Sequence, residues 1–179
     1  MSINAIVVTD DRLTDMRLRA IDKGDIEDLR QWKNANSGSF FLKQEIQPEQ
    51  QQAWFRGFAT RDHDHMFVVE QLTGGDWAKI GCMGFRHLAD ESCVDGYNII
   101  RSRRIDGTGF SMGDAFKLML AYAADRYSDT PIRVKVLSGN PAIAWYERIG
   151  FRTIEERDGY HLMELDKKTL TGIKVVLAK

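Results

Sequence analysis

The segment best suited to bind an anion is a basic, glycine-containing loop between a strand-like stretch and a helix-like one. It runs from Arg101 to Gly109 and holds three arginines and two glycines. Glycines let the backbone approach a phosphate, N–H groups at a helix start point at it, and arginines add positive charge. We therefore predict a diphosphate ligand. Taken alone, a Gly-x-Gly pair before a helix also fits a simple turn with solvated arginines.

Two histidines and two cysteines are the other residues whose chemistry suggests a metal site. His63 and His65 are one residue apart, but no third ligand follows at a spacing suitable for zinc. Cys82 and Cys93 form no Cys-x-x-Cys pair, and two cysteines are too few for a disulfide framework. We expect no metal, a polar loop around the histidines, and a reduced, cytoplasmic compartment.

The elements that must position these residues follow from the spacing of apolar side chains. Residues 17–21 alternate as a strand does, and the next stretch has helical spacing with Asp25 as the expected N-cap. The long helix after the basic loop begins either at Gly109 or nearer Gly113. The expected order is strand 17–21, helices from Asp25 and from Pro48, strands 66–69, 78–85 and 94–100, the long helix, strand 132–136, helix 141–149, and a hairpin of 151–155 with 160–165.

This order predicts an α+β (mixed α/β) fold, in which a mixed, mostly antiparallel, twisted sheet of six to seven strands is flanked by about four helices. A chain of 179 residues fits one domain over residues 1–179. We expect residues 1–15 to add an N-terminal edge strand or arm, and residues 167–179 a C-terminal tail or edge strand. An exposed sheet edge is compatible with a monomer or a homodimer.

The composition excludes several classes of protein. Hydrophobic residues make up 43% and charged residues 28% of the chain, which is typical of a globular protein and not of a disordered one. The formal net charge is −1, so we expect neither nucleic acid nor a membrane as a partner. The apolar stretch 3–8 is too short for a spanning helix and lacks the basic residues that precede a secretory signal.

Two blocks of sequence match the motifs of one enzyme family. The block 104–109, RIDGTG, fits a Q/R-x-x-G-x-G/A diphosphate signature, and Gly96-Tyr97 precedes Gly107 at the family's usual separation. The block 139–151, GNPAIAWYERIGF, fits the pattern G-N-P-A-x-x-x-Y-E-R-x-G-F. On these motifs the chain resembles, from Met16 to Leu165, the GNAT superfamily of N-acetyltransferases.

The resemblance implies acetyl-CoA as the cofactor and transfer of its acetyl group to an amine, by direct attack through a tetrahedral intermediate. Backbone N–H groups where strand 94–100 ends would stabilise the oxyanion. Tyr146 matches the family's general acid, because a phenol with a pKa of about 10 stays protonated at neutral pH. A core tyrosine is the alternative interpretation. The implied cofactor contacts are Asn98, Ile99, Ile100, Arg103, Arg104, Ile105, Asp106, Gly107, Thr108, Gly109, Asn140, Ala142 and Tyr146.

The sequence assigns the general base less clearly. Many family members carry a glutamate two residues before the Gly-Tyr pair, where this chain has Val94. Asp95 is the catalytic carboxylate that we take forward, with Glu91, His87 or a chain of water molecules as alternatives. Asp95 and His87 could also simply stabilise a strand end.

The N-terminal third supplies the acceptor wall in the resembling family, and here it is rich in aromatic and amide side chains. Rings at such a wall can stack on a sugar, a base or a peptide end. The segment resembles the branch that acetylates nucleotide-linked amino sugars, including those of the pseudaminic-acid pathway, and also the branch that acetylates ribosomal proteins. Core packing of the two tryptophans is the alternative. The substrate-binding residues that we expect are Trp32, Asn34, Phe41, Trp54 and Tyr97.

Three functions remain open from the sequence. The first is acetyl-CoA-dependent N-acetylation of a primary amine on a small molecule, with a nucleotide-linked amino sugar as one candidate. The second is acetylation of protein N-termini, and the third is a non-catalytic module that binds acyl-CoA. Val94 in place of an acid keeps the third alternative open, whereas Tyr146 argues for an enzyme.

Overall fold

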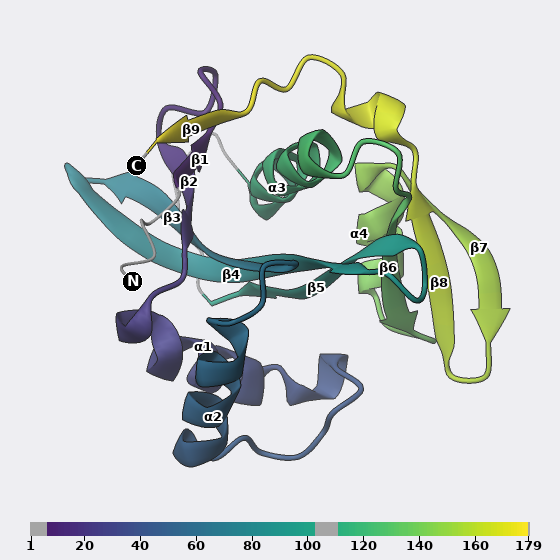
Figure 1. The fold of residues 1–179 in the computed structure, drawn as a ribbon, viewed down its shortest axis with the longest axis horizontal. Helices are drawn as coiled ribbons and strands as arrows, with labels where there is room; N and C mark the ends of the chain where they lie inside the picture. The colour runs from purple at the N-terminus through teal and green to yellow at the C-terminus, as the bar shows by residue number, and fades with distance from the viewer. Residues whose placement is uncertain (1–6, 103–110, 179) are drawn as a thin grey trace.

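The computed structural model describes residues 7–102 and 111–178. Its centre is a twisted, mixed sheet with the strand order β7-β8-β6-β5-β4-β3-β2-β1-β9, with helices on both faces (Figure 1). All neighbouring strands are antiparallel except β5 and β6. The strands are β1 Val7–Thr9, β2 Met16–Ala20, β3 Asp64–Thr73, β4 Asp76–Leu88, β5 Cys93–Arg101, β6 Ile132–Leu137, β7 Phe151–Arg157, β8 Tyr160–Leu165 and β9 Val176–Ala178.

Four α-helices lie in the described residues: α1 Ile26–Ala35, α2 Pro48–Phe58, α3 Met112–Arg126 and α4 Ala142–Ile149. Helices α1 and α2 cover one face of the sheet, and α3 crosses the other (Figure 1). Leu118, Met119 and Leu120 of α3 are fully buried, so this helix is enclosed on most sides. The α+β class expected from the sequence is confirmed.

The sheet has nine strands in the described residues, whereas the sequence predicts six to seven. The two additional strands come from the terminal segments, where β1 and β9 pair with each other. The expected N-terminal strand is therefore not an edge strand: β1 lies between β2 and β9, and β9 is the edge. Pairing of two short segments 167 residues apart is a long-range contact that local sequence patterns do not encode.

Two helix starts differ in detail from the sequence expectations. A 3₁₀ turn, Lys23–Asp25, precedes α1, and Asp22 rather than Asp25 caps it through a hydrogen bond from the Gly24 N–H. Asp25 makes no capping hydrogen bond to α1. Helix α3 begins at Met112 with Ser111 as its N-cap, so the start lies near Gly113 and not at Gly109.

Gly113 is needed for the close approach of α3 and α4. A Cβ at this position would lie 3.2 Å from Ser111 Oγ and 3.3 Å from Ile149 Cδ1. A side chain there would require the Ser111 and Ile149 side chains to shift by a few tenths of an ångström, because such contacts are tighter than packed atoms normally make. This packing places α4, which carries Tyr146, in the same core as α3.

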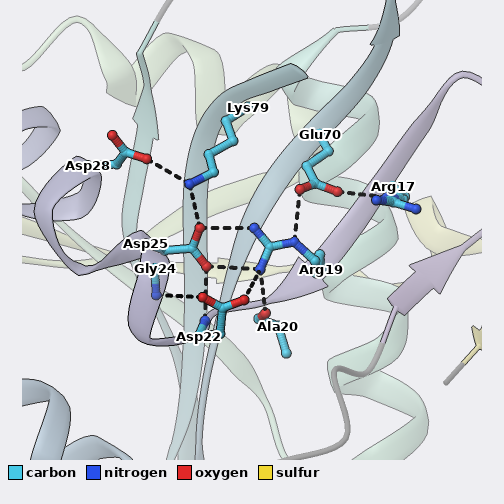
Figure 2. A network of polar contacts seen from close by, with 9 residues as sticks. All are labelled: Arg17, Arg19, Ala20, Asp22, Gly24, Asp25, Asp28, Glu70 and Lys79. Atoms are coloured by element: carbon cyan, nitrogen blue, oxygen red, sulfur yellow. Dashed lines mark hydrogen bonds and ion pairs between the residues drawn. The ribbon is translucent and has the colours of Figure 1, made fainter. Parts of the chain in front are cut away.

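A buried network of ion pairs holds the start of α1 against the sheet (Figure 2). Asp25 accepts hydrogen bonds from Arg19 of β2, at 2.9 Å to each carboxylate oxygen, and lies 2.7 Å from Lys79 Nζ of β4. Glu70 of β3 bridges Arg19 and Arg17. Burial alone would raise the pKa of Asp25, but its hydrogen bonds from Arg19, Lys79 and the Asp22 backbone lower it to about 2. The network therefore fixes α1, one wall of the site described next.

Strand β5 separates from β6 soon after the two strands begin to pair. Their register includes only Val94 with Ile132 and Asp95 with Arg133. Beyond Asp95, β5 has no partner strand on its β6 side within residues 7–102 and 111–178. On its β4 side, β5 has a bulge at which Asn98 and Ile99 together face Met83. The sheet is thus open along the second half of β5.

Candidate active site

A cavity of about 520 Å³ lies where β5 and β6 diverge. Its walls come from β5, the start of α4, and the segment between α1 and α2. The structure therefore brings together residues from three distant parts of the chain. The sequence-predicted residues that line this larger cavity are Phe41, Trp54, Asp95, Tyr97, Asn98, Ile99, Ile100, Asn140, Ala142 and Tyr146.

The predicted diphosphate loop lies outside the described residues. This concerns Arg103, Arg104, Ile105, Asp106, Gly107, Thr108 and Gly109. Its flanks are described: β5 ends at Arg101, which lines the larger cavity, and α3 begins at Met112. The role of the loop in binding a diphosphate remains a prediction from the sequence.

Asn98 has an unusual backbone conformation at the centre of the site. It sits in the bulge of β5 with φ of +51°, a region that asparagine tolerates better than most residues. Lys33 Nζ of α1 donates a hydrogen bond of 2.7 Å to Asn98 Oδ1. The bulge and this bond together set how β5 faces the cavity, since a bulge interrupts the regular strand ladder.

Tyr146 is the buried phenol of the cavity wall. Its ring packs against Phe116, Trp145 and Phe151, with the Phe151 centroid 5.6 Å away. Its hydroxyl makes no hydrogen bond to any residue that the structure describes. Burial, and then the nearby charge of Asp95, raise the pKa of Tyr146. The phenol therefore keeps its proton at neutral pH, and it lines the cavity without a hydrogen-bond partner among residues 7–102 and 111–178.

Asp95 lines the same cavity, and its carboxylate forms an ion pair with an arginine. Arg86 of β4 donates to Asp95 Oδ2 from both Nε, at 3.0 Å, and Nη2, at 2.9 Å. Burial raises the pKa of Asp95, and the charge and hydrogen bonds of Arg86 act in the opposite direction. The two alternative bases lie outside the lining: His87 stacks on Tyr127 at 4.8 Å, and Glu91 pairs with Lys135.

A second, smaller cavity of about 260 Å³ adjoins the first beneath α1 and α2. It is lined on the sheet side by Met66, Cys82 and Ile100, and on the helix side by Leu29, Gln51 and other residues. Gln51 is buried, and its side chain makes no hydrogen bond within the described residues. The residues common to both cavities are Lys33, Leu42, Trp54, Asn98 and Ile100.

Two expected substrate-binding residues lie away from both cavities. Asn34 binds the backbone of Ile46 instead, donating to its carbonyl at 3.0 Å and accepting from its N–H at 2.9 Å. Trp32 packs beside Trp77 and Lys79 on another part of the surface. On a helix, neighbours in sequence point in different directions, which is why Lys33, between them, faces the cavities and they do not.

Sequence reasoning missed the cations of the site other than Arg101, which it places in the basic loop. Lys33, Arg86, Arg101 and Lys135 all line the larger cavity. Arg86 could have been found from register, because it lies opposite Asp95 in the β4–β5 pair. Lys33 could have been found from its place between two residues already assigned to the acceptor wall.

Neither a metal centre nor a spanning helix is found in the described part of the chain. Residues 7–102 and 111–178 contain no cluster of three or more His, Cys, Asp or Glu side chains that could hold a metal ion. No helix in these ranges is long and apolar enough to cross a membrane. Cys82 and Cys93 are both free thiols and both buried.

The fold and the motifs define an acetyltransferase of the GNAT class, and comparison with known proteins agrees. The family model described as acetyltransferase (GNAT) domain matches residues 15–152. The chain therefore belongs to the GNAT acetyltransferase family, and it is an acetyl-CoA-dependent N-acetyltransferase by class. No curated protein sequence matches the chain.

Solved structures with the same fold include enzymes with different acceptors. Apo FdhC, described as a nucleotide-linked sugar GNAT, has 15% identity and a TM-score of 0.71, with 87% of this chain and 89% of that chain covered. The spermidine N-acetyltransferase of Vibrio cholerae in complex with CoA and spermine has 19% identity and a TM-score of 0.70, with coverages of 88% and 98%. A domain from Methanocaldococcus jannaschii has 16% identity and a TM-score of 0.70, with coverages of 84% and 97%.

Proposed function

We propose that this protein binds acetyl-CoA along the open edge of β5 and transfers the acetyl group to a primary amine of a small molecule. One observation carries the proposal: Tyr146 of the block 139–151 and Asn98–Ile100, in the strand that leads to the predicted diphosphate loop, line a single cavity where β5 and β6 diverge. Family membership supplies the class of reaction.

The described residues fit the pantetheine arm of acetyl-CoA. An extended polyamide can pair with an exposed strand edge, and β5 offers such an edge beyond Asp95. Asn140 and Ala142 at the start of α4 form the opposite side of the cavity. When bound, acetyl-CoA supplies a thioester carbonyl that an amine can attack. The sequence places its diphosphate on the loop 103–109.

Tyr146 is the proposed general acid. Transfer forms a C–N bond, breaks the C–S bond, and leaves a thiolate that must take up a proton. The Tyr146 hydroxyl holds a proton at neutral pH and has no competing hydrogen-bond partner among the described residues, so it can donate to sulfur. Backbone N–H groups at the bulge of β5 are the proposed donors to the carbonyl oxygen as its negative charge develops.

The amine must lose a proton during transfer. Among the described residues that line the larger cavity, Asp95 is the one carboxylic acid. We propose that it accepts this proton, directly or through water. Burial raises the pKa of Asp95, which makes it a better base than an exposed carboxylate. Arg86 keeps the side chain in place beside the cavity.

We propose a nucleotide-linked amino sugar as the acceptor to test first. Phe41 and Trp54 line the larger cavity and offer rings on which a sugar or a base can stack. One structural neighbour is described as a nucleotide-linked sugar GNAT. We expect the reaction to take place in the cytoplasm, a reducing compartment in which free thiols such as Cys82 and Cys93 persist.

Two measurements test the proposal. Isothermal titration should show binding of acetyl-CoA, and release of the CoA thiol should then be followed over a panel of nucleotide-linked amino sugars, simple amines and N-terminal peptides. Turnover with a small amine supports the proposal. Turnover with peptides alone would favour protein N-terminal acetylation, and binding with no turnover on any acceptor would favour a non-catalytic acyl-CoA-binding module.

A further inference from the structure

Lys33 occupies the junction of the two cavities. It projects from α1 and lines both of them. Its Nζ donates to Asn98 Oδ1 at 2.7 Å and lies 5.1 Å from the centroid of the Phe40 ring. Both of these partners are uncharged. Any acceptor that reaches from the smaller cavity to the bulge of β5 therefore passes beside this ammonium group.

Among the described residues, Lys33 lacks the carboxylate partner that Arg86 and Lys135 of the same cavity have. Arg86 pairs with Asp95 at 2.9 Å, and Lys135 pairs with Glu91 at 2.9 Å. Lys33 makes no ion pair within residues 7–102 and 111–178. It is a partly buried positive charge whose neighbours, as far as the structure describes them, are an amide oxygen and a ring.

The other titratable groups near Lys33 do not neutralise it. Burial lowers the pKa of Lys33; Cys82 acts in the opposite direction, and the positive Arg86 lowers the pKa further. The Cys82 thiol is itself uncharged at neutral pH, because burial raises its pKa to about 12. Glu45 is the acid in the described lining of the smaller cavity, and its negative charge helps to raise the pKa of Arg30 of α1.

An unpaired ammonium in a partly enclosed site is costly, and an incoming anion reduces that cost. A substrate group with negative charge would gain a charge-assisted hydrogen bond from Lys33, while a second ammonium would be repelled. The lining of the larger cavity reinforces this preference, since Lys33, Arg86, Arg101 and Lys135 outnumber Asp95 among the described residues, while the smaller cavity has one cation, Lys33, and one acid, Glu45.

We propose that Lys33 binds a carboxylate or phosphate of the acceptor, so that this enzyme acetylates amines that carry a negative charge rather than polyamines. The proposal rests on the proposed function and narrows its substrate class. It predicts a different preference from that named for the structurally similar spermidine N-acetyltransferase. The shared fold does not decide this point, whereas the charge at the junction of the cavities does.

A matched set of amino sugars tests the proposal. Glucosamine is the neutral reference, muramic acid adds a carboxylate, and glucosamine 6-phosphate adds a phosphate. A UDP-linked amino sugar and spermidine complete the set. In wild-type protein we expect kcat/KM for at least one anionic member to exceed that for glucosamine at least tenfold, with spermidine the poorest acceptor.

Variants assign the effect to Lys33. Lys33→Met should raise KM for the anionic acceptor tenfold to a hundredfold, roughly the effect of one charge-assisted hydrogen bond, with kcat within about threefold and an unchanged Kd for CoA. Lys33→Arg should recover most of the loss. Lys43→Met removes a charge from the segment between α1 and α2, where Lys43 binds the Gly38 carbonyl, and should leave all of these values unchanged.

Each other outcome overturns one of the two proposals. Equal turnover of glucosamine and its anionic relatives, or a preference for spermidine, would refute the role of Lys33 and leave N-acetyl transfer intact. A weaker Kd for CoA, or a shifted pH profile of kcat in Lys33→Met, would assign Lys33 to the cofactor or to proton transfer instead.

If no amine were acetylated, the proposed function would fail. Titration of glucosamine 6-phosphate into the CoA complex of wild type and Lys33→Met would then still decide whether Lys33 binds an anion.

Discussion

At the scale of single residues, the environment of Tyr146 decides which proton it can move. Three aromatic rings pack against its own ring, and the residue is buried in the wall of the cavity. The same burial that raises the pKa of Tyr146 also keeps the phenolate from forming. The group is therefore protonated at neutral pH, so it has a proton to donate, whereas it would first have to lose that proton to act as a base.

The variant Tyr146→Phe tests this assignment. It removes one oxygen and leaves the ring packing in place, so we expect kcat to fall about a hundredfold or more while the Kd for acetyl-CoA stays within twofold. Steady-state thiol release and isothermal titration measure the two quantities. A parallel loss of cofactor affinity would instead indicate that the hydroxyl has a binding role.

Motif residues of the site could be predicted from sequence, whereas its paired charges could not. Tyr146 and Asn140 belong to the block 139–151, and Asn98 lies in the strand that leads to the predicted diphosphate loop. The structure places all three at one cavity. Arg86 and Lys33 belong to no motif, and only strand register and position beside Trp32 and Asn34 could have suggested them. Asn34 was misplaced because its amide, suitable for binding a substrate, is used to hold the backbone of Ile46.

At the scale of elements, the shape of β5 depends on how closely β4 can approach it. A Cβ on Gly81 would lie 2.1 Å from the carbonyl oxygen of Ile100, which lines both cavities. No side chain fits there without moving one of the two strands, because the atoms that it would meet belong to the backbone of Ile100 and Arg101. Glycine at position 81 is therefore a requirement of the site's geometry.

Gly81→Ala should consequently destabilise the protein by roughly 2 kcal/mol or more, because it overpacks a backbone contact. We also expect weaker acetyl-CoA binding, since the displaced strand is the proposed cofactor edge. Urea unfolding and titration measure these effects. Gly57→Ala in α2 is the matched control: a Cβ there meets nothing within 4 Å, and helix propensity should make it neutral or stabilising by up to about 1 kcal/mol. Equal behaviour of the two variants would contradict the steric argument.

The ion network beneath α1 makes a prediction about pH. The pKa of Asp25 falls from 3.8 to about 2 on folding, so the folded state binds this proton less tightly than the unfolded state. The stabilisation is therefore complete above about pH 4 and is lost as the pH falls through about 2, amounting to about 2 kcal/mol. Asp25→Asn should cost about 3 kcal/mol at pH 7, because it leaves Arg19 and Lys79 without their shared carboxylate.

Unfolding of Asp25→Asn by urea between pH 2 and 7 measures both effects. The free energy of unfolding of the variant should fall less steeply than that of the wild type as the pH is lowered below about 4. Asp28→Asn removes the other partner of Lys79, at a position 42% exposed, and should cost less than about 1 kcal/mol with the pH dependence of the wild type. Similar losses of unfolding free energy in the two variants would show that burial of Asp25 does not increase its contribution to stability.

Regular elements follow from local patterns, but the features that create the site do not. Helices α2 and α4 and the β3–β4 hairpin lie where apolar spacing and glycine turns predict them. The bulge at Asn98 and the early divergence of β5 and β6 depend on register between strands. One long-range pattern was nevertheless present: Asp64, Arg86, Asp95, Arg133 and Glu164 are register partners across five strands and alternate in charge. Such cross-strand pairs help fix register.

At the scale of the whole molecule, the site joins parts of the chain that fold on opposite faces of the sheet. Tyr146 belongs to the core that includes α3, whereas Trp54 and Lys33 come from the helices of the other face. The gap beside β5 lets side chains from both faces reach the same cavity. Ligand binding in that cavity should therefore stabilise the whole molecule rather than only the elements on one face of the sheet.

Thermal unfolding with acetyl-CoA tests this coupling. A ligand at 100 times its Kd that binds only the folded state adds about 2.7 kcal/mol of stability, which corresponds to roughly 5–10 °C in Tm for a chain of this size. Tyr146→Phe should show the same shift as wild type, because its phenol acts only as the thiolate leaves. Arg104→Ala, in the loop that the sequence assigns to the diphosphate, should lose most of the shift while keeping its ligand-free Tm. Were Arg104→Ala to retain the full shift, the diphosphate would be bound elsewhere, and acetyl-CoA would be held by the β5 edge and α4 alone.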